Sequence, residues 1–278
     1  MATDRGRTLS VPLPRRWIGD MLHSAQRVPT VGGERILKLR KLVDARKRSR
    51  NGASWQALII KGLGIVSERV PELKRAYLPF PTAKLYESPY PVASVVFERE
   101  FAGESATFLA PMIQPNLMPL QEIMQRVHAW KTDPIQKHGP LRRLVRNAKP
   151  PLPIRRMLWW IGLNLSGYMR ARMFGTFAVN TIANTRAHMT HFASPLTSVW
   201  YYDAVNPRGE MDLRLAFDHR VFDGSTIGRA MTELESVMNT ELVDELLYDE
   251  AETTDGTIKF PMPGSVLPLI LNEDEVAA

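Results

Sequence analysis

The segment DHRVFDG, residues 218–224, constrains this chain more than any other part of it. Apolar and polar residues alternate over 211–217 just before it, which predicts a half-buried strand. Just after it, Ser225 or Thr226 can cap a helix whose apolar residues recur at helical spacing over 227–238. His219 is therefore predicted to lie at a turn between a strand and a helix.

The position suits a catalytic base. A neutral imidazole has an ordinary pKa near ~6.5, so His219 can accept a proton from a hydroxyl or a thiol. The structural alternative makes His219 an ordinary turn residue and Asp223 a turn former ahead of Gly224. The motif is short enough to recur by chance, so these residues alone leave both interpretations open.

Five segments taken in chain order resemble the catalytic domain of the dihydrolipoyl acyltransferases of 2-oxoacid dehydrogenase complexes and, more distantly, chloramphenicol acetyltransferase. FDHRVFDG resembles the family signature DHR-V-x-DG. The other four segments are RRWIGDMLHSAQRVPTV, SWQALIIKGLGIVSERVPEL, FLAPMIQPNLMPLQEIMQRVHAW and FGTFAVNTIAN. Together they extend from about Leu13 to Leu247, which is nearly the whole chain.

The resemblance implies an α/β fold: a two-layer sandwich of the chloramphenicol acetyltransferase type, with a mixed sheet packed by helices and three chains in a trimer. The catalytic domain is expected over 14–248, between a flexible N-terminal tail, 1–13, and a C-terminal tail, 249–278. The sequence shows no lipoyl-lysine hairpin and no swinging linker, so a stand-alone member of the superfamily is expected.

The resemblance also implies a function, the transfer of an acyl group from a thioester to a small-molecule or carrier-bound acceptor. Acyl-CoA is the expected cosubstrate, and no permanently bound cofactor is expected. His219 matches the catalytic base, and the active sites are expected in channels between subunits.

Asn180 stands where the family has a serine, with Thr181 beside it, and an asparagine amide can donate to an oxyanion. The motif residue Asp223 is implied to form a structural ion pair with Arg15, Arg16 being the next candidate. The changed residue at 180 leaves an alternative, a catalytically inactive trimeric scaffold or assembly protein.

An insertion over about 131–172 departs from the family. It holds ten Lys and Arg residues and a single acidic one, Asp133, in a chain whose net charge is only +7. Its candidate contacts with an anionic partner are Arg142, Arg143, Arg146, Arg155 and Arg156. CoA phosphates, an acidic carrier protein or an anionic membrane surface would suit it. Nucleic acid is disfavoured because no nucleic-acid-binding signature accompanies it. A solvated loop leading into a core helix over 154–169 is the alternative.

Other features of the sequence narrow the class of protein and of site. The absence of cysteine excludes thiolate nucleophiles, cysteine-ligated metals and disulfides. No metal site is expected, since His188 and His191 lack further ligands at a convincing distance. The start lacks an apolar signal segment, and the apolar run after 156 is too short to span a bilayer, so a cytoplasmic location is expected. Helices are predicted over 34–50, after Gly32 and Gly33, and from Ser54 to Val70.

Overall fold

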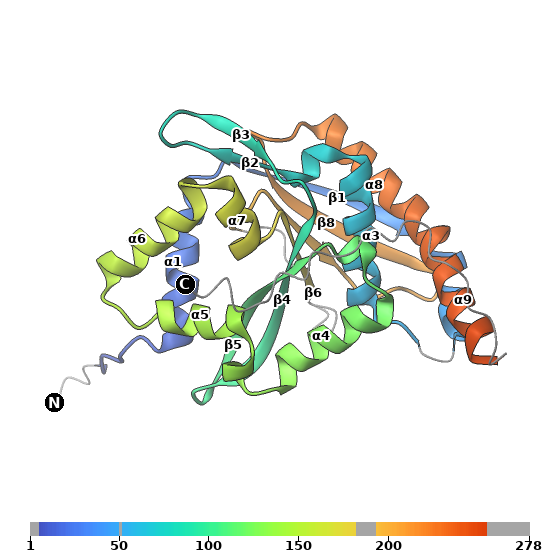
Figure 1. The fold of residues 1–278 in the computed structure, drawn as a ribbon, viewed down its shortest axis with the longest axis horizontal. Helices are drawn as coiled ribbons and strands as arrows, with labels where there is room; N and C mark the ends of the chain where they lie inside the picture. The colour runs from blue at the N-terminus through green and yellow to red at the C-terminus, as the bar shows by residue number, and fades with distance from the viewer. Residues whose placement is uncertain (1–5, 50–51, 182–192, 255–278) are drawn as a thin grey trace.

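A six-stranded mixed sheet organises the chain (Figure 1). The computed structural model describes residues 6–49, 52–181 and 193–254, so His188 and His191 lie outside the described residues. The strand order is β1-β8-β7-β6-β4-β5, and a separate hairpin is formed by β2 and β3. The strands are β1 (Thr30–Lys38), β2 (Arg75–Leu78), β3 (Lys84–Glu87), β4 (Val92–Phe101), β5 (Glu104–Ile113), β6 (Phe177–Thr181), β7 (Ser198–Tyr202) and β8 (Glu210–Asp218).

The pairing of the strands makes the sheet mixed. β1 and β7 are antiparallel to β8, and β5 is antiparallel to β4. β6 runs parallel to both β4 and β7. The connection between β4 and its parallel neighbour β6 passes through β5 and four helices, including those of the insertion. The predicted α/β class with a mixed sheet packed by helices is confirmed.

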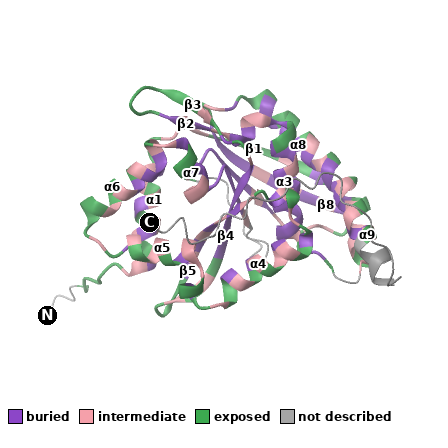
Figure 2. Cartoon of the chain, in the orientation of Figure 1, coloured by how far each residue is buried: buried purple, intermediate pink, exposed green. Residues whose placement is uncertain are grey.

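The helices lie in two groups around the sheet. In order they are α1 (Leu13–Ala25), α2 (Arg40–Arg48), α3 (Trp55–Arg69), α4 (Leu120–Thr132), α5 (Gly139–Asn147), α6 (Leu152–Asn164), α7 (Gly167–Phe174), α8 (Gly224–Asn239) and α9 (Glu241–Thr254). The helices α3, α4 and α8 lie to one side in Figure 1, whereas α1, α5 and α6 gather at the opposite end. Burial is greatest in the central strands and in α3 (Figure 2).

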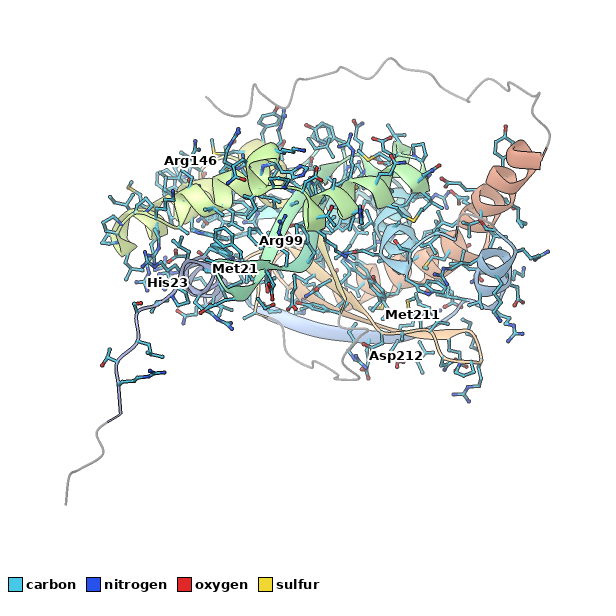
Figure 3. All side chains as sticks on the ribbon, turned by 90° about the horizontal axis from the view of Figure 1, so that it is seen from below. Met21, His23, Arg99, Arg146, Met211 and Asp212 are labelled. Atoms are coloured by element: carbon cyan, nitrogen blue, oxygen red, sulfur yellow. The ribbon has the colours of Figure 1, made fainter. Side chains whose placement is uncertain are left out.

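The two faces of the sheet are covered unequally. Alternate residues of a strand point to opposite faces. Val95, Val179 and Trp200 belong to the main core, whereas their neighbours Val96, Ala178 and Val199 form a small second cluster with Leu196. Phe174 at the end of α7 packs on this second cluster. Figure 3 shows the described part of β1 and β8 with no helix beneath them on that side.

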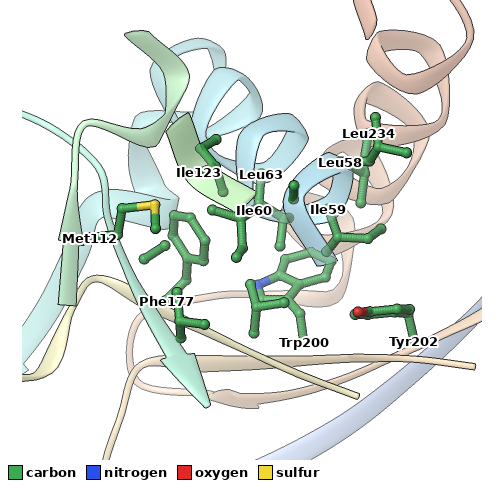
Figure 4. Close-up of a cluster of buried hydrophobic side chains, with 14 of the residues drawn as sticks. Leu58, Ile59, Ile60, Leu63, Met112, Ile123, Phe177, Trp200, Tyr202 and Leu234 are labelled. Carbon is green, nitrogen blue, oxygen red and sulfur yellow. The ribbon is translucent and has the colours of Figure 1, made fainter. Parts of the chain in front are cut away.

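The main core forms around α3, which is buried on nearly every side. Ile59 and Ile60 lie on the side of α3 that faces Trp200 and Phe177 of the sheet, whereas Leu58 lies near Leu234 of α8 (Figure 4). Ser54 caps the helix as predicted, its side chain accepting a hydrogen bond from the Ala57 amide at 3.2 Å. Gly64 permits a close approach, because a Cβ there would lie 2.8 Å from the backbone nitrogen of Asn116.

The basic helix predicted over 34–50 is wrong in its first part. Residues 34–38 belong to the edge strand β1, which also contains Gly32 and Gly33, and the helix α2 begins at Arg40. Pairing with β8 along the whole of β1 outweighs the local pattern. Ile36, expected on an apolar helix face, is 57% exposed on the strand.

The insertion is folded. It forms α5, α6 and α7, so neither a solvated loop nor one core helix over 154–169 describes it. Ser166 caps α7, since its hydroxyl accepts from the Met169 amide at 3.3 Å. Several apolar residues of α6 are exposed, among them Ile154 at 44% and Met157 at 53%, whereas Trp159 and Leu163 are buried.

A buried ion pair holds the insertion against α1. The Arg155 guanidinium donates to both carboxylate oxygens of Asp20, at 2.7 Å and 3.3 Å. The side chains are 11% and 2% exposed respectively. Both charges are therefore largely removed from water and depend on each other for compensation.

We expect Arg155→Ala to lower the free energy of unfolding by about 3–5 kcal/mol, because it leaves the buried Asp20 charge without a partner. Urea denaturation measures the change. Arg142→Ala on the exposed face of α5 is the matched control and should change stability by less than about 0.5 kcal/mol. Removing both charges, with Asp20→Asn and Arg155→Met together, should recover part of the loss. Equal effects of Arg155→Ala and Arg142→Ala would contradict the interpretation.

Candidate functional site

His219 lies in the turn that follows β8, as predicted from the sequence. Its backbone N–H donates to the carbonyl of Pro29 at 3.1 Å, which ties the turn to the segment before β1. Its Nδ1 lies 2.9 Å from the carbonyl oxygen of Phe222. A carbonyl only accepts, so this contact places the proton on Nδ1 and leaves Nε2 free to take a proton. The side chain is exposed on the single chain.

The two neighbours of His219 in the motif form an ion pair of their own. The Arg220 Nε and Nη2 donate to the two carboxylate oxygens of Asp218 at 2.9 Å and 2.7 Å. The Arg220 backbone N–H also donates to Asp218, at 3.0 Å. The guanidinium lies over the ring of Tyr77, 4.2 Å from its centroid. Asp218 is 1% exposed, so these contacts fix the backbone on both sides of His219.

A second arginine lies beneath this pair. Arg170 of α7 is 5% exposed and donates to the carbonyls of Leu163 at 3.1 Å and Pro195 at 2.9 Å. Burial lowers the pKa of Arg170 to about 10, Asp218 partly offsets this, and Arg220 adds to it. Asp218 is thus the carboxylate that faces two guanidinium groups. The letters of the motif contain Asp218 and Arg220, but only the packing of α7 reveals Arg170.

Asn180 lies on the second face of the sheet. It is directly opposite Tyr201 in the pairing of β6 with β7. Its side chain hydrogen-bonds the Tyr201 hydroxyl, although burial outweighs that bond and raises the pKa of Tyr201 to about 12. Asn180 itself is half-buried. Thr181 ends β6, and its side chain lies outside the described residues.

One chain does not bring Asn180 and His219 together. The pairings place Asn180 level with Tyr201, and Tyr201 level with Arg214 of β8. His219 lies five residues farther along β8 and two strands away. With a rise of about 3.3 Å per residue and about 4.8 Å between strands, the separation is on the order of 20 Å.

Arg15 and Asp223 are not brought together either. Asp223 is exposed and precedes the first residue of α8, whose cap had been predicted at Ser225 or Thr226. Arg15 is exposed near the opposite end of α1 from the motif. Among the described residues no ion pair joins them, and Arg16, the next candidate, donates to the carbonyl of Val11 at 3.0 Å.

The five arginines predicted to face an anionic partner separate into different settings. Arg142 and Arg146 are exposed on α5, and Figure 3 labels Arg146 on the upper side and His23 of α1 on the lower side of the same end of the molecule. Burial lowers the pKa of Arg143, and the charges of Arg146 and Arg172 lower it further. Arg155 is bound to Asp20, which leaves it unavailable to a partner. Arg156 lines a cavity between α1 and α6.

Two features are absent from the part of the chain that the structure describes. Within 6–49, 52–181 and 193–254, no three His, Asp or Glu side chains are grouped so that they could hold a metal ion. None of the helices described is both long enough and apolar enough to cross a membrane.

We expect Asp218→Asn to lower the free energy of unfolding by about 3–5 kcal/mol, because it leaves Arg170 and Arg220 without their shared countercharge. The control is Asp212→Asn, also on β8, where the carboxylate has no ion-pair partner among the described residues. It should change stability by less than about 0.5 kcal/mol in the same urea titration. Equal losses in the two variants would show that the Asp218 charge does not stabilise this region.

No family model matches the sequence, and no curated protein sequence matches it. Several solved structures match the fold of this chain. A dihydrolipoamide acetyltransferase from Azotobacter vinelandii, studied for the roles of a serine, a histidine and an asparagine in its mechanism, is 14% identical with a TM-score of 0.62, covering 88% of this chain and 96% of that one. A probable dihydrolipoamide acetyltransferase from Listeria monocytogenes is 16% identical with a TM-score of 0.60, covering 86% and 95%.

A third match is a truncated catalytic core of the 2-oxoacid dehydrogenase complex from Thermoplasma acidophilum. It is 13% identical with a TM-score of 0.59 and covers 85% of this chain and 99% of that one. Each match spans almost the whole of the other chain and 85% to 88% of this one. This chain therefore has the fold of the catalytic cores of dihydrolipoamide acetyltransferases.

Proposed function

We propose that the protein transfers an acyl group from a thioester, acyl-CoA above all, to a small-molecule or carrier-bound acceptor, with His219 as general base. The observation that carries the proposal is the contact between Nδ1 of His219 and the Phe222 carbonyl at 2.9 Å. It holds the imidazole in the tautomer that a base requires and leaves Nε2 exposed. The fold supports the same conclusion, since acetyltransferases share it.

The active site is shared between two copies of the chain. His219 and Asn180 are on the order of 20 Å apart in one chain, too far to act on the same carbonyl. Both lie at surfaces that a second copy can reach, His219 on an exposed turn and Asn180 on the thinly covered face of the sheet. A closed trimer repeats one such contact three times, so three sites form together. Asp223 and Arg15, which one chain leaves apart, are proposed to pair in the same assembly.

The reaction then follows from the two groups. Nε2 of His219 takes the proton from the acceptor as the acceptor attacks the thioester carbonyl. The Asn180 amide of the neighbouring copy donates to the oxyanion that develops. When the tetrahedral intermediate collapses, the thiol of the donor leaves with the proton that His219 returns. The ion pair between Asp218 and Arg220 keeps the turn that carries His219 rigid during the reaction.

A catalytically inactive trimeric scaffold is the second candidate. One observation favours it: the Asn180 side chain is engaged by the Tyr201 hydroxyl. An amide has two N–H donors, so a hydrogen bond to the Tyr201 hydroxyl is compatible with donation to an oxyanion. The hydrogen bond therefore restrains the donor without removing it, and the acyltransferase remains the better-supported function.

The test is acyl transfer from acetyl-CoA to dihydrolipoamide, with the thioester product measured by mass spectrometry. His219→Ala should abolish transfer, and Asn180→Ala should slow it by about 10²–10³-fold. Mixed trimers made by refolding the two variants together distinguish a shared site from a site within one chain. Random mixing restores both groups at about a quarter of the shared sites and at none of the sites within one chain.

Two outcomes would contradict the proposal. If His219→Ala has activity close to that of the unmodified protein, His219 is not the general base. If the mixed trimers are as inactive as the two parent variants, the site is not shared between copies. If the unmodified protein forms trimers but transfers no acyl group to any thiol, hydroxyl or amine acceptor offered, the scaffold is favoured.

A further inference from the structure

A cavity of about 520 Å³ lies between α1, α6 and the turn after β2. Four arginines line it, namely Arg27, Arg156, Arg170 and Arg220, together with His23. No Asp or Glu is among the described residues that line it. The neighbouring carboxylates are already bound, Asp20 by Arg155 and Asp218 by Arg220. The cavity therefore has an excess of positive charge.

The base of the cavity is rigid. Arg170 is anchored by the carbonyls of Leu163, Pro195 and, at 3.5 Å, Tyr77. Arg220 is fixed by Asp218 below and by the Tyr77 ring beside it. Two guanidinium groups near a single carboxylate repel each other, and the burial of Arg170 strengthens that repulsion. An anion bound beside them would relieve it.

The mouth of the cavity presents two free cations. Arg27 and Arg156 are exposed, and neither has a hydrogen bond or an ion pair among the described residues. Their elements face each other because Arg155, next to Arg156, is bound to Asp20 of α1. A guanidinium fork matches a carboxylate or a phosphate, and two forks at one opening suit an oxyanion.

Much of the remaining wall is apolar, with Ser24 and Asn164 as its polar members. Met157 is 53% exposed and Trp160 is 39% exposed, and the Trp160 ring meets Phe80 edge-on with 5.4 Å between centroids. Val28, Pro79 and Leu163 complete this wall. Large apolar side chains left in contact with water beside an arginine-rich opening fit a ligand that has both an apolar body and an anionic head.

We propose that this cavity binds a small amphipathic oxyanion, a carboxylate or phosphate monoester on an alkyl or aryl body. Arg27 and Arg156 hold the head, and Met157 and Trp160 cover the body. The site is distinct from the proposed acyl-transfer site, because six of its fourteen described lining residues come from the insertion helices α6 and α7 and neither His219 nor Asn180 is among them. It stands independently of the proposed function.

Isothermal titration calorimetry of the full chain with sodium decanoate tests the proposal. The variant Arg27→Ala with Arg156→Ala should raise the Kd at least about tenfold by removing two charge-assisted contacts. The matched control, Arg142→Ala with Arg146→Ala, removes the same charge from α5 outside the cavity and should leave the Kd unchanged. Both pairs are exposed, so neither variant is expected to affect folding. Decyl phosphate in place of decanoate identifies the preferred head group, and tight binding of either supports the site.

Decanol, which has the same chain and no charge, should bind at least about tenfold more weakly than decanoate, since the head group carries the recognition. Decanol binding as tightly as decanoate would overturn the proposal, because the cavity would then be recognising the chain alone. Equal losses in the two double variants would overturn it as well, because net charge and not the cavity would then govern binding. An absence of measurable binding of either anion would have the same consequence.

Discussion

The Asp218 carboxylate holds together parts of the chain that are distant in sequence. It lies at the end of β8, binds Arg220 through two oxygens and faces the buried Arg170 of α7. The turn that carries His219 and the insertion are thereby joined at one buried negative charge. The main core alone would not fix this region, because it lies on the other face of the sheet, around α3. A buried carboxylate paired with one guanidinium group and attracted by a second is costly to bury but specific in geometry, since its removal leaves buried positive charge without compensation.

The unequal covering of the sheet decides where chemistry can occur. Among the described residues, α3 and α8 cover one face with the main core, whereas α7 covers part of the other. Asn180, Tyr201 and Arg214 lie on that second face, in line across three strands. His219 is not near these three residues, because β8 continues beyond Arg214 and His219 follows the end of the strand. A single chain therefore presents each half of a site at a separate place on its surface, and the joining of copies is a requirement of the proposed reaction.

Predictions from the sequence are most reliable where the local residue pattern and the tertiary pairing of strands and helices agree. The strand over 211–217 and the helix after Ser54 were predicted correctly, because their apolar spacing matches the faces they bury. Residues 34–38 were misassigned because an edge strand with one paired side tolerates charged and exposed residues, which locally resemble a basic helix. His219 could be located from its motif. The separation of His219 from Asn180 could not, since it depends on strand order, which the spacing of residues does not encode.

The insertion shows why a count of charges does not predict a surface. Its ten Lys and Arg residues suggested one basic patch. Arg155 is bound to a buried aspartate, Arg170 is bound to three carbonyls, and Arg143 is half-buried, so a large part of that charge serves the packing of α5, α6 and α7. Of the exposed arginines, Arg142 and Arg146 lie on α5 and Arg156 lines the cavity. Arg156 lies in a cavity that Arg27 also lines, so two segments of the chain supply cations to the same place. The cavity, and not the insertion as a whole, is therefore suited to recognise an anion of defined shape.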